Sequence, residues 1–372
     1  MGAISALRFI IFSALFLVLA ACATSSKPSH NEISKDLPED RRADRRSDQQ
    51  NGFVITRKES SQISANILSL EGGSAFLAAA AEELRASISD EPNEFTPVQS
   101  FTSIQADPQR VARLQLFNRK FGFGSFVAVW VLKDENLQAQ MRKRILDWAR
   151  VYKPAGDATQ ENSFRGLAIA YAYLKDGYSE VERSEVTHWF SMIVRAQELK
   201  RAQASASSVE DLIFQMMLAS TVGLAIESDE IQHMVQARFA NFIESSIDRD
   251  GYVAFARAKK DWRLNIISLH HLLTMSVELL RAGLITKPDY FSDGKPLFRS
   301  IRILNEARNM KGPDWTKQDA GYAIYAFQVA AYIDPAYATT ARLNAGRRTT
   351  SSPQLSLAYY SGLDPTIHEI AP

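Results

Sequence analysis

Apolar residues recur with the spacing of an α-helix along most of the chain from residue 53 onward. Spacings of i, i+3 and i+4 place apolar side chains on one face of a helix, where they can pack against a core. The pattern predicts helices over 76–84, 111–121, 137–152, 166–174, 186–199, 212–226, 231–243, 264–280, 297–307 and 320–333. No strands alternate with these helices, so the predicted fold class is all-α.

Short segments rich in Gly, Pro and Asp separate the predicted helices at 153–157, 176–177, 248–251 and 311–313. Such residues stop helices and form turns. Helices in antiparallel succession form either an α-solenoid or a partly closed ring of helical hairpins. Solenoid arrays show self-similarity at a fixed period, and this sequence has none. The pattern therefore favours the ring of helical hairpins over residues 53–337, followed by a partly irregular tail over 338–372.

The composition supports a folded helical domain and excludes several kinds of site. Because 46% of the 372 residues are hydrophobic, the chain can bury a core and is not disordered as a whole. The 43 basic and 42 acidic residues leave a net charge of +1, without the basic surplus that nucleic-acid binding requires. The one cysteine excludes an intramolecular disulfide, a CxxC redox centre and a thiolate zinc cluster.

The first 21 residues have the pattern of a secretory signal peptide. Arg8 is followed by an apolar run over 9–21 that only Ser13 interrupts. At about 1.5 Å per residue this run is too short to cross a membrane, but it matches the apolar core of a signal peptide. The run ends in Leu-Ala-Ala directly before Cys22, which resembles the lipobox of bacterial lipoproteins.

The lipobox resemblance implies cleavage before Cys22 and lipid attachment to its sulfur, which would anchor the chain without making it span the membrane. Ala23 is not the aspartate associated with inner-membrane retention, so we expect the outer membrane, facing the periplasm. Residues 22–52 have few large apolar side chains and are predicted to be a disordered tether. The arginines over 41–46 are interleaved with acidic residues, which favours a solvated linker over contact with anionic lipid or polysaccharide.

Four segments resemble the alginate lyase family of polysaccharide lyases. They are the tryptophan-bearing segment 145–152, the Ala-Tyr-Ala-Tyr segment 166–175, the Trp-Phe segment 186–190 and the Asp-Arg-Asp-Gly-Tyr turn over 247–252. The resemblance covers about residues 137–283. It implies an incomplete α/α toroid with a long cleft on one face. It also implies β-elimination on uronic-acid polymers in the periplasm, beside an exopolysaccharide export machine.

β-Elimination requires a group that neutralises the uronate carboxylate, a base that takes the C5 proton and an acid for the leaving oxygen. The family supplies these groups through an Asn-Asn-His segment and through an arginine followed by a Tyr-His pair. The first segment falls near 206–211 in this sequence, and its asparagines and histidine are absent. In the second, Leu264 or Ile266 takes the place of the tyrosine, and an apolar side chain cannot transfer a proton.

A basic segment over 257–263 keeps the cations of the second motif. The resemblance places substrate-binding cations here, and an aromatic side chain beside them could stack on a sugar face. The candidate substrate-binding residues are Arg257, Lys259, Lys260, Trp262 and Arg263. The alternative is a solvated surface that precedes the start of a helix.

Two residues near the basic segment are candidates for proton transfer. Tyr252 follows the predicted turn directly and has an exchangeable phenol, although its family equivalent usually packs as phenylalanine. His271 forms a pair with His270, and adjacent helical residues point about 100° apart, so at most one faces a shared site. The alternative is that one imidazole packs in the core and the other is exposed.

The remaining titratable residues suggest structural roles. His188 lies beside Trp189 on an amphipathic helix and is predicted to be a partly buried packing residue. No histidines are spaced as HxxxH or HExxH, so no zinc site is predicted. The 248–251 segment lacks the remaining ligands of an EF-hand, which favours a tight turn over a calcium site.

Three functions remain open, and none implies a cofactor. The chain could bind an acidic exopolysaccharide and cleave it as a lyase, or it could bind or scaffold the polymer during export without cleaving it. It could instead be an interaction module that docks export proteins. A lyase requires a titratable group facing the cations, whereas a binding protein requires only cations and aromatics. An interaction module would show an exposed apolar patch away from the cleft.

Overall fold

The computed structural model describes residues 96–104, 107–203 and 208–307, together with Glu82, Arg85 and Ile88. The predicted signal peptide, Cys22, the tether and the C-terminal tail lie outside the described residues. The whole of the predicted helix 320–333 and all of the predicted helix 76–84 except Glu82 also lie outside the described residues. The described residues are mostly helical and contain no strand, which confirms the all-α class. None of the described helices is long and apolar enough to cross a membrane.

Each helix predicted between residues 111 and 307 is present, with ends that differ by a few residues. The α-helices are α5 (Pro108–Phe126), α6 (Glu135–Val151), α7 (Ala158–Glu161), α8 (Arg165–Leu174), α9 (Glu180–Gln203), α10 (Val209–Ala225), α11 (Asp229–Ser246), α12 (Ala254–Ala258), α13 (Trp262–Arg281), α14 (Lys287–Phe291) and α15 (Pro296–Ala307). The pattern missed the short helices α7, α12 and α14. It also missed three 3₁₀ turns, η1 (Phe101–Ile104), η3 (Asn162–Phe164) and η4 (Lys175–Gly177). The π-helix η2 (Val127–Leu132) continues α5.

Side-chain caps explain where five of the helices begin. The side-chain oxygen of the residue before each helix accepts a hydrogen bond from a backbone N–H in the first turn, over 2.9–3.4 Å. These contacts satisfy N–H groups that have no partner within the helix. The capping residues are Asp134, Asp157, Ser208, Ser228 and Asp261.

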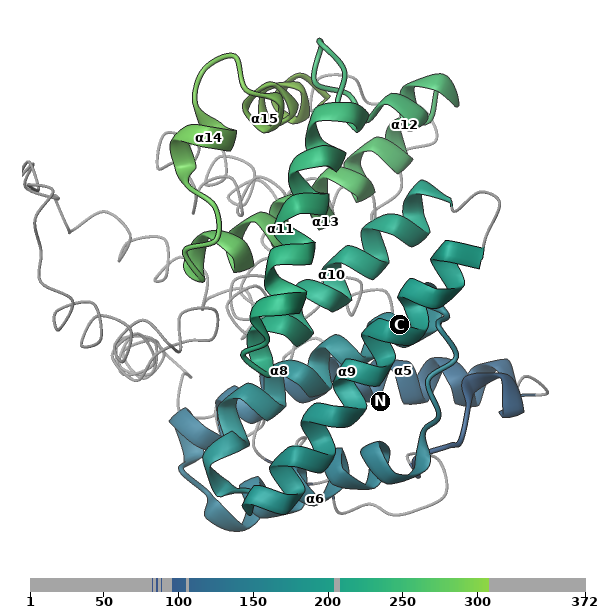
Figure 1. Ribbon diagram of the computed structural model, residues 1–372, viewed down its shortest axis with the longest axis vertical. Coiled ribbons are helices and arrows are strands. Elements are labelled where there is room, and N and C mark those ends of the chain that lie inside the picture. The colour runs from purple at the N-terminus through teal and green to yellow at the C-terminus, as the bar shows by residue number, and fades with distance from the viewer. Residues whose placement is uncertain are drawn as a thin grey trace, which may run out of the picture.

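Helices α10 and α13 lie against each other and run in the same direction (Figure 1). Phe214 of α10 meets His271 of α13 edge-on, with 5.2 Å between the ring centroids. Seven residues further along both helices, the Thr221 hydroxyl donates to the Glu278 carboxylate over 3.1 Å. Because both contacts advance together along the two helices, α10 and α13 are parallel, and α11 returns the chain between them.

Helix α8 continues this layer alongside α10. Before α8 begins, the Thr159 hydroxyl donates to Asp211 near the start of α10 over 3.4 Å. Further along, Arg165 donates from Nε to the Thr221 hydroxyl near the end of α10 over 2.9 Å. The segment from α7 to α8 therefore runs parallel to α10.

Helix α5 completes the layer and packs closely against α8. Gln115 donates from Nε2 to the carbonyl of Gln160 over 3.3 Å. Gly166 then lies directly against α5, where an added Cβ would stand 2.0 Å from the carbonyl oxygen of Asn118. Only glycine permits this approach, because any side chain would collide with backbone. The contacts again advance in the same direction, so α5, α8, α10 and α13 form a first layer of parallel helices.

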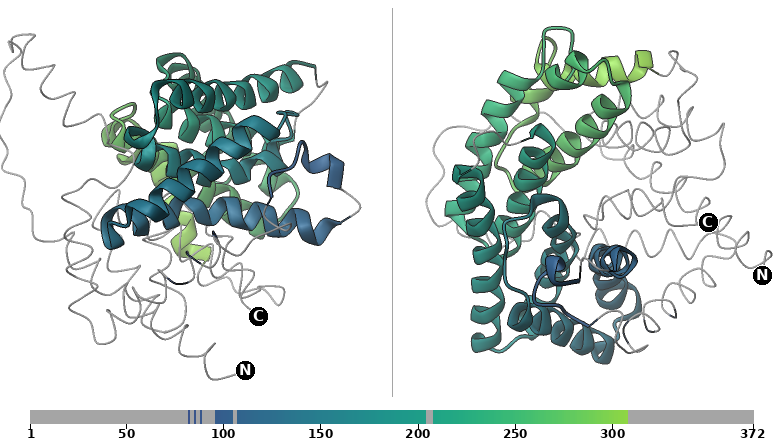
Figure 2. Two further views of the ribbon diagram at one scale, coloured as in Figure 1. Left: turned by 90° about the horizontal axis from the view of Figure 1, so that it is seen from below. Right: turned by 90° about the vertical axis from the view of Figure 1, so that its right-hand side faces the viewer.

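Helices α6, α9 and α11 form a second layer. The Tyr178 hydroxyl donates to the carbonyl of Arg142 over 3.1 Å, and Arg150 pairs with Glu185 over 2.9 Å, so α6 and α9 also run parallel. An ion pair likewise joins α11 to α9. Short connections link successive helices of the two layers into hairpins. In the right-hand view of Figure 2 the described helices follow a curve, from α5 and α6 at the bottom to α15 at the top.

Aromatic side chains hold the first hairpins together. The ring of Phe164, which is fully buried, lies within 4.7–5.6 Å of four other aromatic rings, measured between centroids. Those rings belong to Phe101, Trp148, Tyr152 and Trp189. Three of these pairs meet edge-on and the pair with Phe101 is stacked, and aromatic pairs of both kinds contribute beyond the area that they bury. The tryptophans of the segments 145–152 and 186–190 therefore belong to the core.

Candidate functional site

The predicted turn after α11 is present and is tightly bonded. The Asp248 carboxylate accepts hydrogen bonds from the backbone N–H groups of Asp250 and Tyr252 over 2.9 and 3.0 Å. Gly251 has φ 94°, which favours glycine, and an added Cβ there would meet the backbone of Arg299 at 2.6 Å. The Ser300 hydroxyl donates to the Gly251 carbonyl over 2.8 Å, which fixes α15 against the turn.

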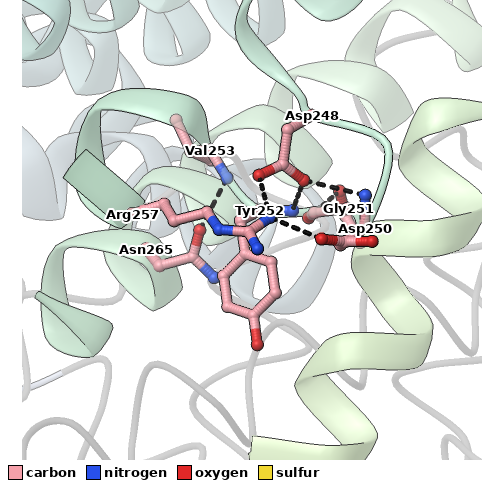
Figure 3. Close-up of polar contacts among 8 residues, drawn as sticks. Asp248, Asp250, Gly251, Tyr252, Val253, Arg257 and Asn265 are labelled. Carbon is pink, nitrogen blue, oxygen red and sulfur yellow. Dashed lines mark hydrogen bonds and ion pairs between the residues drawn. The ribbon is translucent and has the colours of Figure 1, made fainter. Parts of the chain in front are cut away.

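Arg257, on the short helix α12, reaches back to this turn (Figure 3). Its Nη1 pairs with Oδ2 of Asp248 over 2.7 Å and with Oδ2 of Asp250 over 2.6 Å. The guanidinium carbon lies 5.1 Å from the ring centroid of Tyr252, in a cation–π contact. Asn265 of α13 joins the assembly by accepting a hydrogen bond from the backbone N–H of Val253 over 2.8 Å.

The carboxylates already neutralise the charge of Arg257. Partial burial raises the pKa of Asp248, but hydrogen bonds from Arg257 and from two backbone N–H groups outweigh it and hold that pKa below its usual value. The hydrogen bonds that Arg257 donates, first to Asp248 and then to Asp250, raise the pKa of Arg257. Arg257 is therefore a group that orders the turn, and a uronate would have to compete with two aspartates for it.

The other cations of the basic segment lie at the junction of α12 and α13. Lys259, Lys260 and Arg263 are exposed, and Lys260 has φ 55°, which turns the chain between the two helices. Among the residues that the structure describes, neither Lys259 nor Lys260 has an ion-pair partner. Trp262 begins α13, and its side chain lies outside the described residues. The basic segment thus divides into one cation held in the turn and three on the surface.

His270 and His271 are both buried, with 0% and 3% of their surface exposed. The expectation that one of them would be exposed is wrong, because neighbouring parts of the fold, α10 among them, cover this stretch of α13. The two imidazoles lie 5.0 Å apart between centroids, and His271 also contacts Phe214 of α10. At 1.5 Å per residue, His271 stands about 12 Å along α13 from Arg263.

The two candidates for proton transfer are not brought together. Tyr252 is half-buried beside Arg257, at the level where Asn265 binds the segment before α12. His271 lies six residues beyond Asn265, or about 9 Å further along the helix. Of the two, only Tyr252 lies beside the basic segment. The prediction for His188 was also wrong, because its side chain is exposed on α9.

A charged network in the core was missed by the sequence analysis. Arg165 donates from Nη2 to Glu278 over 2.6 Å and from Nε to Thr221 over 2.9 Å, and Thr221 also donates to Glu278. The three side chains join α8, α10 and α13 and are almost entirely buried. A signal was present in the sequence, since Arg165 directly precedes the apolar run 166–174 and Glu278 is the only acidic residue within the apolar run 264–280.

A second buried carboxylate orders the segment between α6 and α7. Glu161 is fully buried and accepts hydrogen bonds from the Tyr152 hydroxyl, the Ala155 N–H and Gln197, over 3.0, 2.7 and 3.3 Å. Burial raises the pKa of Glu161 above its usual value, although the hydrogen bonds oppose this effect. These partners are all structural, and the basic segment contributes none of them.

In comparisons with known proteins, no family model and no curated protein matches this chain.

Proposed function

We propose that this chain is a lipid-anchored periplasmic protein that binds an acidic, uronate-containing exopolysaccharide. The observation that carries the proposal is the group of three exposed cations, Lys259, Lys260 and Arg263, on a junction that Arg257 and its two aspartates hold in place. A site for a polyanion needs cations that are accessible and do not move apart when salt or substrate changes. An ordered turn beneath exposed side chains meets both needs.

The architecture proposed for this function is the incomplete (α/α) toroid. A toroid of helical hairpins requires one layer of parallel helices inside and a second layer, of the opposite direction, outside. The parallel series α5, α8, α10 and α13, with α6, α9 and α11 as the returning helices, is the support for that architecture. The resemblance to the alginate lyase family is a further support, carried by the segments 145–152, 166–175, 186–190 and 247–252.

Binding without cleavage is favoured over a lyase. The segment near 206–211 lacks the asparagines and histidine of the family, and His271 is enclosed between α10 and α13. Tyr252 is the remaining candidate for proton transfer, and its ring is covered on one face by Arg257. Cleavage therefore rests on one phenol, whereas binding rests on three cations.

The lipid anchor at Cys22 is part of the proposal and has its own measurement. In a bacterial host, the Cys22→Ser chain should lose incorporation of labelled fatty acid and should leave the membrane fraction or stay uncleaved. Retention of both label and membrane association would contradict the anchor but would leave the polysaccharide site untouched.

The binding site is tested with the full chain and a purified polyuronate, with a neutral glucan as the control polymer. An exposed ion pair contributes up to about 1 kcal/mol, so replacing Lys259, Lys260 and Arg263 together by glutamine should weaken polyuronate binding by about tenfold or more. Binding by the unaltered chain should weaken steeply with salt, because the Debye length falls to about 8 Å at physiological ionic strength. Affinity can be measured by titration calorimetry.

The matched control removes three exposed cations elsewhere, in the variant Lys143→Gln, Lys200→Gln and Arg302→Gln. It changes the net charge equally and should bind as the unaltered chain does. Equal loss of affinity in both variants would mean that only net charge matters and would contradict a site at the α12–α13 junction. A lyase would produce unsaturated-uronate absorbance that grows with time and that Tyr252→Phe abolishes. That result would show cleavage of the polymer and would contradict binding without cleavage.

A further inference from the structure

The large apolar side chains that the described residues expose all lie on one helix. Val181, Met192 and Leu199 of α9 expose 76%, 39% and 64% of their surface, and no other large hydrophobic residue in the described part of the chain is exposed. Isolated exposed apolar residues are ordinary, so the feature that sets these three apart is that they share one helix. This surface is far in sequence from the basic segment and is independent of the polysaccharide site.

These side chains form a straight stripe along α9. Successive residues of an α-helix are rotated by about 100°, so positions 7, 11 and 18 residues after Val181 point within about 20° of it. Those positions are His188, which is exposed, followed by Met192 and Leu199. The opposite side of α9 is buried against the first layer through Phe190 and its neighbours. The spacing of seven, four and seven residues is that of a helix that packs against another helix.

The stripe is complementary to itself when it is reversed. Val181 and Leu199 stand nine residues on either side of Phe190, and His188 and Met192 stand two residues on either side. Glu185 and Arg195 stand five residues on either side, at intermediate positions of the same face. An antiparallel second copy would therefore place apolar against apolar at both ends, and acidic against basic between them. A two-fold axis at the level of Phe190 generates every one of these pairs twice.

We infer that the stripe Val181, Glu185, His188, Met192, Arg195 and Leu199 of α9 is the surface through which two copies of this chain pair as an antiparallel, two-fold symmetric dimer. Charge complementarity selects a second copy as the occupant. Both oxygens of Glu185 already accept hydrogen bonds from Arg150, so Arg195 of the second copy would share that carboxylate with Arg150. Arg195 is exposed and has no ion-pair partner among the described residues. The stripe from Val181 to Leu199 is about 27 Å long, which suits a dimer that forms and separates reversibly.

The symmetry predicts a pattern of charge reversal that no other partner would give. Glu185→Lys places the introduced lysine of one copy against Arg195 of the other, and Arg195→Glu places two acidic residues together, so each variant alone repels its own copy twice. Mixed in equal amounts, the two variants regain attraction between opposite charges across the interface. Each variant alone should associate about tenfold or more weakly than the unaltered chain, and the mixture should recover as a heterodimer.

The experiment uses the full chain in nonionic detergent, with masses measured by sedimentation over a wide range of protein concentration. Arg302→Glu, on α15, changes the net charge as Arg195→Glu does and should dimerise as the unaltered chain does. The double variant Val181→Glu with Leu199→Glu should be monomeric. Its far-ultraviolet spectrum should be unchanged, because both side chains are exposed. An unaltered chain that stays monomeric, single variants that still dimerise, or a mixture that forms no heterodimer would each overturn the inference.

Discussion

Two regions of the molecule use arginine–carboxylate contacts in opposite surroundings. In the core, Arg165 and Glu278 pair with side chains that are 3% and 8% exposed, whereas Arg257 is 52% exposed where it pairs with Asp248. The buried pair joins helices far apart in the sequence, and the exposed pair closes a turn between neighbouring segments. The same chemistry therefore sets the packing of three helices in one place and the shape of a surface junction in the other.

The two arginines differ in whether water can solvate their carboxylate partners once the arginine is removed. If Arg257 is removed, water solvates Asp248 and Asp250, so an exposed pair contributes little to stability. If Arg165 is removed, Glu278 stays in the core without its ionic partner, where little water can reach it. Arg165 also keeps one buried nitrogen, Nη1, without a hydrogen-bond partner among the described residues. Breaking the core network therefore costs much stability, although one of its hydrogen-bond donors has no partner.

The largest expected effect is on the buried pair. Arg165→Met should lower the free energy of unfolding by about 3–5 kcal/mol, because it leaves a buried carboxylate without its cation. The double variant Arg165→Met with Glu278→Leu should be more stable than the single one, because it removes both charges from the core. Urea unfolding, followed by circular dichroism, measures both values.

Arg257→Gln is the matched surface change for this comparison. It should cost far less stability than Arg165→Met, and its effect should shrink further in high salt. A single Arg165→Met variant that is no less stable than Arg257→Gln would show that burial does not separate the two regions. A double variant as unstable as the single one would show that the loss comes from packing and not from the unpaired charge.

A smaller effect, on pH dependence, sharpens the contrast between surface and core. The pKa of Asp248 is lowered in the folded protein. Asp248 therefore contributes stability above its usual pKa of about 4, and this stability is lost as pH falls through the pKa that Asp248 has in the folded protein. The pKa of Glu161 is raised in the folded protein. Glu161 therefore contributes stability below its usual pKa, and this stability is lost as pH rises through the pKa that Glu161 has in the folded protein. The two carboxylates should therefore change stability in opposite directions.

Urea unfolding between about pH 3 and pH 8 measures this contrast. The variants Asp248→Asn and Glu161→Gln are each compared with the unaltered chain. The advantage of the unaltered chain over Asp248→Asn should shrink toward low pH. Its advantage over Glu161→Gln should grow toward low pH. Parallel curves for both variants would contradict the assignment of opposite shifts.

Local patterns predicted the helices well because the signals that form a helix are close together in the sequence. The 3.6-residue repeat and the capping side chains, such as Asp134 and Ser208, act within a few residues, and each predicted helix between 111 and 307 is present. The tight turn at Gly251 was predicted for the same reason. The burial of His271 was not predicted, because it depends on α10, which lies more than 40 residues earlier.

The basic segment was predicted as one site, and the structure divides it. Arg257 and Asp248 are nine residues apart, but they meet only because the chain reverses at Gly251 and α12 folds back over the turn. The periodicity of α9 predicted an amphipathic helix without indicating that apolar residues also lie on its outer face. A helical repeat states which residues share a face, and the surrounding helices decide which face is covered.

The sequence by itself determined the helices, their capped ends, the turns between them and the positions of the lone charged residues, since each of these depends on neighbours within one or two helical turns. Only the tertiary structure decided that Arg165 meets Glu278, 113 residues away, that Arg257 is neutralised and that the stripe on α9 stays exposed. Contacts of that range form only when the intervening chain is ordered, so their outcome depends on the packing of all the helices together.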